Sequence, residues 1–176
     1  MECSYYERKL NDVIMKCPIE AGVEILVYNV IDSTIDSSKF ALVDINRLWK
    51  DRDSRLQTDS GIADIAILST DFKYRTDIGK VYGFIEVKAT SNELAITEQI
   101  EGQKRGAVHY IYTNGLVWMY FKEGKKEWEK VLASCDNQEC RVMNKFKKVS
   151  IDSEEFSDLI KRLREISWRS CKSINM

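Results

Sequence analysis

The chain has few of the residues that mark several common protein classes. Its 176 residues include one proline, one histidine and five cysteines, and no apolar run approaches the length of a membrane span. A single histidine argues against histidine-dependent catalysis and against a serine-type triad. The cysteines are scattered without a Cys-x-x-Cys pair, so neither a zinc site nor a disulfide framework is supported. The phosphate-binding pattern Gly-x-x-x-x-Gly-Lys is also absent, which excludes an ATPase motor of that type.

The first residues lack the basic segment followed by an apolar segment that a secretory signal requires. Without a membrane span or a disulfide framework, the sequence predicts a cytoplasmic protein with reduced thiols. We expect one domain over residues 1–176, because this length suits a single hydrophobic core and no linker, repeat or low-complexity tract divides it.

Charge is nearly balanced overall but unevenly distributed. The net charge of −1 argues against strong nucleic-acid affinity through total charge alone. Residues 1–100 include 12 basic and 17 acidic side chains, whereas residues 101–176 include 15 basic and 11 acidic ones. The more basic second part fits a solvated surface and a DNA-facing surface equally well.

Hydrophobic periodicity changes from helical to strand-like near residue 60. Helices are expected over residues 4–16, 18–33 and 92–105, and from residue 152 onward. Strands are expected over residues 40–45, 62–68, 81–88, 108–112, 116–121, 128–132 and 142–151. Ser4 is the expected cap of the first helix, Pro18 suits the first turn of the second, and Asn114-Gly115 predicts a hairpin turn. His109 and the aromatic residues around that turn are expected to be structural, with core packing favoured over base stacking.

Two of the expected strands carry charges where a buried strand should have none. Asp64 lies in the apolar stretch of residues 61–68, and Glu86 and Lys88 lie at the end of the stretch over residues 81–88. Because side chains at positions i and i+2 share one face of a strand, Glu86 and Lys88 point the same way. If the two strands are neighbours, all three charged groups meet at one end of the sheet.

Two carboxylates beside a lysine fit metal-dependent chemistry on a phosphodiester. Asp64 and Glu86 offer hard oxygen ligands for Mg²⁺ or Mn²⁺, and waters with the main-chain carbonyl of Val87 would complete the coordination. The ion would polarise the phosphodiester and activate a water. Lys88 would orient that water or stabilise the developing charge. A strand-end salt bridge is the alternative interpretation, because acidic-x-Lys patterns recur by chance.

Four motifs occur in a fixed order: Gly61-Ile62-Ala63-Asp64, then Ile85-Glu86-Val87-Lys88-Ala89, then Gln99, then Tyr112-Thr113-Asn114-Gly115-Leu116-Val117-Trp118. In this order they resemble the PD-(D/E)xK nuclease superfamily, in particular the N-terminal nuclease domain of type I restriction enzyme R subunits. The resemblance covers residues 61–121, about a third of the chain. Ala63 replaces the proline of the superfamily name. In this family the helix after the Glu-x-Lys strand has a Gln-x-x-x-Tyr motif. Gln99 matches its glutamine, and Gln103 stands where the motif has a tyrosine.

The resemblance implies an α/β fold with a restriction-endonuclease-like core, in which helices flank a mixed central β-sheet. It implies Mg²⁺- or Mn²⁺-dependent hydrolysis of DNA phosphodiester bonds in restriction, phage defence or DNA processing. DNA is then the expected partner, with a second copy of the chain or another subunit of a restriction system as further partners. A catalytically silent module that keeps this fold and binds nucleic acid or a partner protein is the alternative.

The resemblance also assigns roles to particular residues. Gln99 would support the site from the helix after the Glu-x-Lys strand. Many domains of this kind add a carboxylate from an N-terminal helix to the metal site. Glu24 is the expected source of that carboxylate, because it shares a helical face with Glu20 and with apolar residues. Glu20 and Glu7 are the weaker alternatives.

Overall fold

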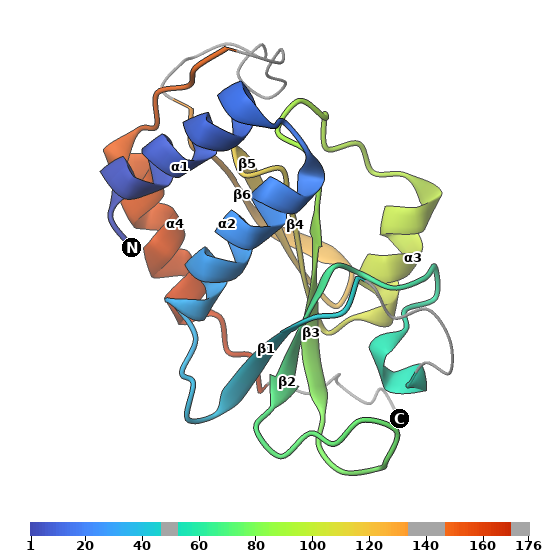
Figure 1. Ribbon diagram of the computed structural model, residues 1–176. Coiled ribbons are helices and arrows are strands. Elements are labelled where there is room, and N and C mark those ends of the chain that lie inside the picture. Colours follow the sequence, from blue (N-terminus) through green and yellow to red (C-terminus); the bar gives the residue numbers. More distant parts are fainter. Residues whose placement is uncertain (47–52, 134–146, 170–176) are drawn as a thin grey trace.

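A computed structural model describes residues 1–46, 53–133 and 147–169 of the chain (Figure 1). Its centre is a six-stranded sheet in the order β1-β2-β3-β4-β5-β6. The strands are β1 Phe40–Asp44, β2 Ile65–Ser69, β3 Val81–Val87, β4 His109–Thr113, β5 Val117–Lys122 and β6 Lys125–Val131. Neighbouring strands run antiparallel except β3 and β4, which are parallel. The predicted α/β class with a mixed central sheet is confirmed.

Helices cover both faces of this sheet. Three of them, α1 Cys3–Lys16, α2 Glu20–Asp32 and α4 Ser153–Glu165, lie on one side, and α3 Glu98–Gly106 lies on the other (Figure 1). The short 3-10 helix η1 Ser54–Leu56 precedes β2. Because parallel strands need a crossover connection, α3 joins β3 to β4 as one β-α-β unit.

The alternation of side chains along the strands explains the two layers. In β2, Ile65 and Ile67 join the core under α1, α2 and α4, whereas Ala66 and Leu68 join the core under α3. Every residue of β2 is buried, which accounts for its continuous apolar sequence.

The two N-terminal helices begin at different residues from those predicted. Helix α1 begins at Cys3, and Glu2 rather than Ser4 occupies its cap position without a side-chain hydrogen bond. Helix α2 begins at Glu20 because Ile19 is extended, so Pro18 precedes the helix and does not lie in its first turn. The buried face of α2 consists of apolar residues: Val23, Leu26, Val27, Val30 and Ile31.

The third helix is shorter than predicted. It begins at Glu98, where the Thr97 hydroxyl oxygen accepts a hydrogen bond from the Ile100 amide over 3.3 Å. Residues 92–97 are not helical, and the Asn92 carbonyl accepts a hydrogen bond from the Asn114 side chain over 2.9 Å. That contact connects this segment with the hairpin turn between β4 and β5.

The structure describes only part of the strand predicted over residues 142–151. Residues 142–146 lie outside the described residues, and residues 147–150 are not in a strand. Ile151 forms an isolated antiparallel bridge with Ala133. Asp152 caps α4, as its acidic start predicted, by accepting hydrogen bonds from the amides of Glu154 and Glu155.

The residues expected to be structural lie in the cores. His109 is buried and its Nδ1 lies 2.7 Å from the Tyr120 hydroxyl, and Trp118 and Tyr110 are fully buried. Gly115, with φ +83°, makes the turn of the Asn-Gly hairpin. Cys3 and Cys17 are free thiols, and the other three cysteines lie outside the described residues. Within residues 1–46, 53–133 and 147–169, no helix has the length and apolar character needed to cross a membrane.

Candidate active site

Hydrogen bonds at the start of β2 fix the position of Asp64. Its amide donates to the Ile85 carbonyl over 3.1 Å, and its own carbonyl accepts from the Ile45 amide over 2.8 Å. The carboxylate Oδ2 accepts a hydrogen bond from the Val87 amide over 2.6 Å. The neighbouring strands β2 and β3 therefore bring Asp64 against the end of β3, as the sequence predicted for adjacent strands.

Glu86 and Lys88 form an ion pair at that same end of β3. Lys88 Nζ lies 2.7 Å from Glu86 Oε1. The Lys88 amide donates to the Thr113 carbonyl over 2.8 Å, which keeps the chain extended beyond the last residue of β3. The i, i+2 spacing thus places both side chains together, and the salt bridge expected as the alternative interpretation is present.

Helix α2 brings two further carboxylates to the site. One carboxylate oxygen from each of Glu20, Glu24 and Asp64 lies within 4.8 Å of the others. Lys88 Nζ is 3.9 Å from Glu20 Oε2, so Glu20 faces both the acidic cluster and the lysine. The Asn46 side chain donates to Glu24 Oε1 over 3.1 Å. Glu7 lies elsewhere, since its carboxylate accepts from the Ile151 amide over 2.8 Å.

The acidic groups are costly to ionise where they stand. Burial, together with the charges of Glu86 and Glu24, raises the pKa of Asp64 to about 8, although the Val87 amide and Lys88 act in the opposite direction. Burial also raises the pKa of Glu86, although Lys88 and Gln103 favour its ionised form. A bound divalent cation would relieve this repulsion, and these carboxylate oxygens are the donors that Mg²⁺ and Mn²⁺ prefer.

Lys88 remains charged in these surroundings. Burial alone lowers the pKa of a lysine, but the hydrogen bond to Glu86 and the charges of Glu86, Glu20 and Asp64 together raise the pKa of Lys88 above its ordinary value. The site therefore combines a protonated amine with a cluster of carboxylates. That combination can bind a cation through the carboxylates and an anion through the amine.

Gln103 contacts the Glu-Lys pair, and Gln99 does not. Gln103 is buried, and its Nε2 donates to Glu86 Oε2 over 3.1 Å and lies 3.4 Å from the Ile62 carbonyl oxygen. Gln99 is exposed on the first turn of α3, one helical turn earlier. Helical spacing could have identified Gln103, because it lies three residues after Ile100 on the face of α3 that packs on the sheet.

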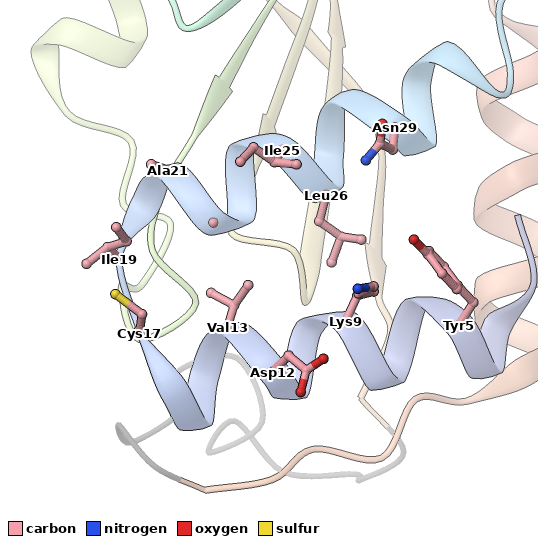
Figure 2. A pocket seen from close by; sticks show the side chains of 11 residues that line it. Tyr5, Lys9, Asp12, Val13, Cys17, Ile19, Ala21, Ile25, Leu26 and Asn29 are labelled. Atoms are coloured by element: carbon pink, nitrogen blue, oxygen red, sulfur yellow. The ribbon is translucent and has the colours of Figure 1, made fainter.

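Residues of α2 line two surface cavities. A cavity of about 310 Å³ is lined by Glu24, Asp44, Tyr28 and Ile65, among others, and adjoins the acidic cluster. A groove of about 490 Å³ separates α1 from α2 on another side, and apolar side chains such as Val13, Leu26 and Ile25 line it (Figure 2). None of the residues that converge on Asp64 lines the groove, so the acidic cluster and the groove are separate features.

Comparison with known proteins adds information on the fold. No protein-family model matches the chain, and no curated protein gives a significant sequence match. Among solved structures, the DrdV chain in a cryo-electron microscopy structure of the DrdV–DNA complex is similar, with a TM-score of 0.53 and 12% sequence identity. The match covers 93% of this chain and 13% of the DrdV chain. At this identity the likeness concerns the fold, and the chain corresponds to a small part of the larger protein.

Proposed function

We propose that this chain is a Mg²⁺- or Mn²⁺-dependent nuclease that hydrolyses DNA phosphodiester bonds. The observation that carries the proposal is the meeting of Asp64, Glu86 and Lys88 at one end of the sheet, with carboxylates of α2 beside them. An acidic cluster alone would fit many roles. A buried carboxylate pair next to a charged lysine favours a site that holds a cation and a phosphate together.

In this proposal each residue of the site has a separate role. Asp64, Glu86 and the Val87 carbonyl hold the metal, and Glu24 extends the set from α2. The bound ion would supply Lewis acidity at a phosphodiester oxygen and lower the pKa of a coordinated water. Lys88 orients the attacking water or stabilises charge on the phosphate as it develops. Gln103 takes the supporting position that the sequence assigned to Gln99.

DNA as the substrate is supported by two independent observations. The motifs over residues 61–121 resemble the PD-(D/E)xK superfamily. The fold is similar to part of a protein whose solved structure is a complex with DNA. Restriction or phage defence is the setting that the sequence resemblance implies. Because the match covers 13% of the DrdV chain, we include a partner subunit or a second copy among the proposed partners.

A plasmid-cleavage assay tests the proposal. Purified chain is incubated with supercoiled plasmid, linear duplex and single-stranded DNA in Mg²⁺, Mn²⁺ or EDTA. We expect nicking that requires the metal and that falls about a hundredfold or more in Asp64→Asn and in Lys88→Met. Asp71→Asn and Lys73→Met are matched controls, because both residues are exposed at the opposite end of β2 and β3. They should cleave like the wild type.

Wild-type protein that cleaves none of these substrates with either metal would contradict the enzymatic proposal for the isolated chain. Gel-shift binding at low salt then distinguishes the silent alternatives. Retained DNA binding would favour a nucleic-acid-binding module, and loss of it would favour a protein-interaction module.

A further inference from the structure

Tyr110 is connected to the acidic site through a single intervening side chain. Its hydroxyl donates to Gln103 Oε1 over 2.6 Å, and Gln103 Nε2 donates to Glu86 Oε2 over 3.1 Å. The exposed fractions are 0% for Tyr110, 0% for Gln103 and 3% for Glu86, so water does not reach this path freely. The three residues come from β4, α3 and β3, the three elements of the β-α-β unit.

The direction of these hydrogen bonds is fixed by chemistry. A side-chain amide has one accepting end and one donating end. Burial, with the charges of Glu86 and Asp64, strongly raises the pKa of Tyr110, so its hydroxyl stays protonated and can donate. The donated proton holds Gln103 Oε1 toward the tyrosine. The NH₂ group of Gln103 must then face Glu86, since the reverse orientation would place oxygen against the carboxylate.

This arrangement divides the two oxygens of Glu86. Oε2 is held by Gln103, and Oε1 lies 2.7 Å from Lys88 Nζ. Gln103 therefore fixes the carboxylate at Oε2, and Oε1 faces Lys88. We propose that Tyr110 is a positioning residue of the nuclease site, which sets the Gln103 amide so that Glu86 presents Oε1 to Lys88 and to the metal. This inference rests on the proposed function.

Tyr110→Phe is the direct test, because it removes the hydroxyl and keeps the ring that packs 6.1 Å from Phe121 between ring centres. We expect Mn²⁺ affinity, measured by calorimetry on the full chain, to fall about tenfold. The cleavage rate at saturating DNA should fall by a similar factor while the KM for DNA stays unchanged.

Tyr120→Phe is the matched control. Tyr120 is buried on the neighbouring strand β5, but it packs in the core under α1, α2 and α4, and its hydroxyl pairs with His109 rather than with the site. Loss of the Tyr120 hydroxyl should lower the midpoint of thermal unfolding as much as loss of the Tyr110 hydroxyl does. It should leave Mn²⁺ affinity and cleavage at the wild-type level.

A double-mutant cycle with Gln103→Leu separates positioning from general packing. If Tyr110 acts through Gln103, adding Tyr110→Phe to Gln103→Leu changes Mn²⁺ affinity no further. If the tyrosine contributes only to the core, the two effects on affinity add. Additive effects, or wild-type Mn²⁺ affinity in Tyr110→Phe, would overturn the inference.

Hydrogen exchange of the Gln103 side-chain amide, followed by NMR on metal-free protein, tests the same point without activity. We expect slow exchange in wild type and Tyr120→Phe and fast exchange in Tyr110→Phe. Fast exchange in the wild type would overturn the inference even if Tyr110→Phe fails to fold. A wild type that neither binds Mn²⁺ nor cleaves DNA would remove the proposed function, and slow wild-type exchange would still support the fixed amide.

Discussion

Asp64→Asn is expected to stabilise the metal-free protein, and to do so increasingly as pH rises. An aspartate ionises near pH 3.9 in an unfolded chain, whereas burial and the charges of Glu86 and Glu24 raise the pKa of Asp64 to about 8. Between these values the folded protein binds the extra proton, so wild-type stability falls with rising pH. The variant lacks this titration, and the difference between the two proteins should grow from about pH 4 to about pH 8.

The magnitude follows from the size of the pKa difference. Each pH unit in this interval changes the stability difference by at most about 1.4 kcal/mol, which sets an upper limit of about 5 kcal/mol. The hydrogen bond from the Val87 amide is already part of this difference, because it favours the ionised carboxylate and lowers the pKa of Asp64. We therefore expect the variant to be the more stable protein at pH 8, by less than this upper limit.

Urea unfolding in EDTA at several pH values between 5 and 8 measures this difference. Asp71→Asn is the control, because that residue is exposed, and its offset from the wild type should stay constant with pH. Added Mn²⁺ at a hundred times its Kd should stabilise the wild type by about 2.7 kcal/mol and the variant much less. A difference in the free energy of unfolding between the wild type and Asp64→Asn that is the same at every pH would contradict this prediction. A variant that is less stable than the wild type at pH 8 would contradict it too.

Three further predictions concern stability and are measured by urea unfolding. Thr90→Val should stabilise the protein by about 1 kcal/mol, because the buried Thr90 hydroxyl finds no hydrogen-bond partner within the described residues; a loss of stability would show that the hydroxyl is satisfied in solution. Gly79→Ala should cost about 2 kcal/mol or more, because φ is +83° and an added Cβ would lie 2.3 Å from Phe72 Cα; an unchanged unfolding midpoint would contradict the loop geometry. Arg55→Met should lower the urea midpoint of unfolding, because the guanidinium pairs with buried Asp53 and stacks over Phe72; an unchanged midpoint would mean that water replaces the arginine.

The sheet and the pair of charged strands were predictable because their signals are local. Buried strands such as β2 consist of continuous β-branched and apolar residues, and the Asn-Gly turn marks the β4–β5 hairpin. The position of Asp64 opposite Glu86 and Lys88 followed from strand adjacency and a period of two. The sequence left open whether the two charged strands pair, and β2 and β3 do.

The supporting residues depend on packing as well as on local signals. The resemblance assigned Gln99 to the site, whereas Gln103, one turn later on α3, is the glutamine that is buried and donates to Glu86. Glu20 and Glu7 could not be ranked against Glu24, because only the packing of α2 against the end of β3 brings Glu20 to Lys88.

The most direct test of the central claim is the anomalous scattering of Mn²⁺ soaked into crystals of the wild-type chain and of Asp64→Asn. We expect one Mn²⁺ peak in the wild type that is bound by Asp64 together with at least one of Glu86 and Glu24, and no such peak in the variant. No Mn²⁺ peak at these carboxylates in the wild type would contradict a metal site here. The same Mn²⁺ peak in Asp64→Asn as in the wild type would contradict the role of Asp64.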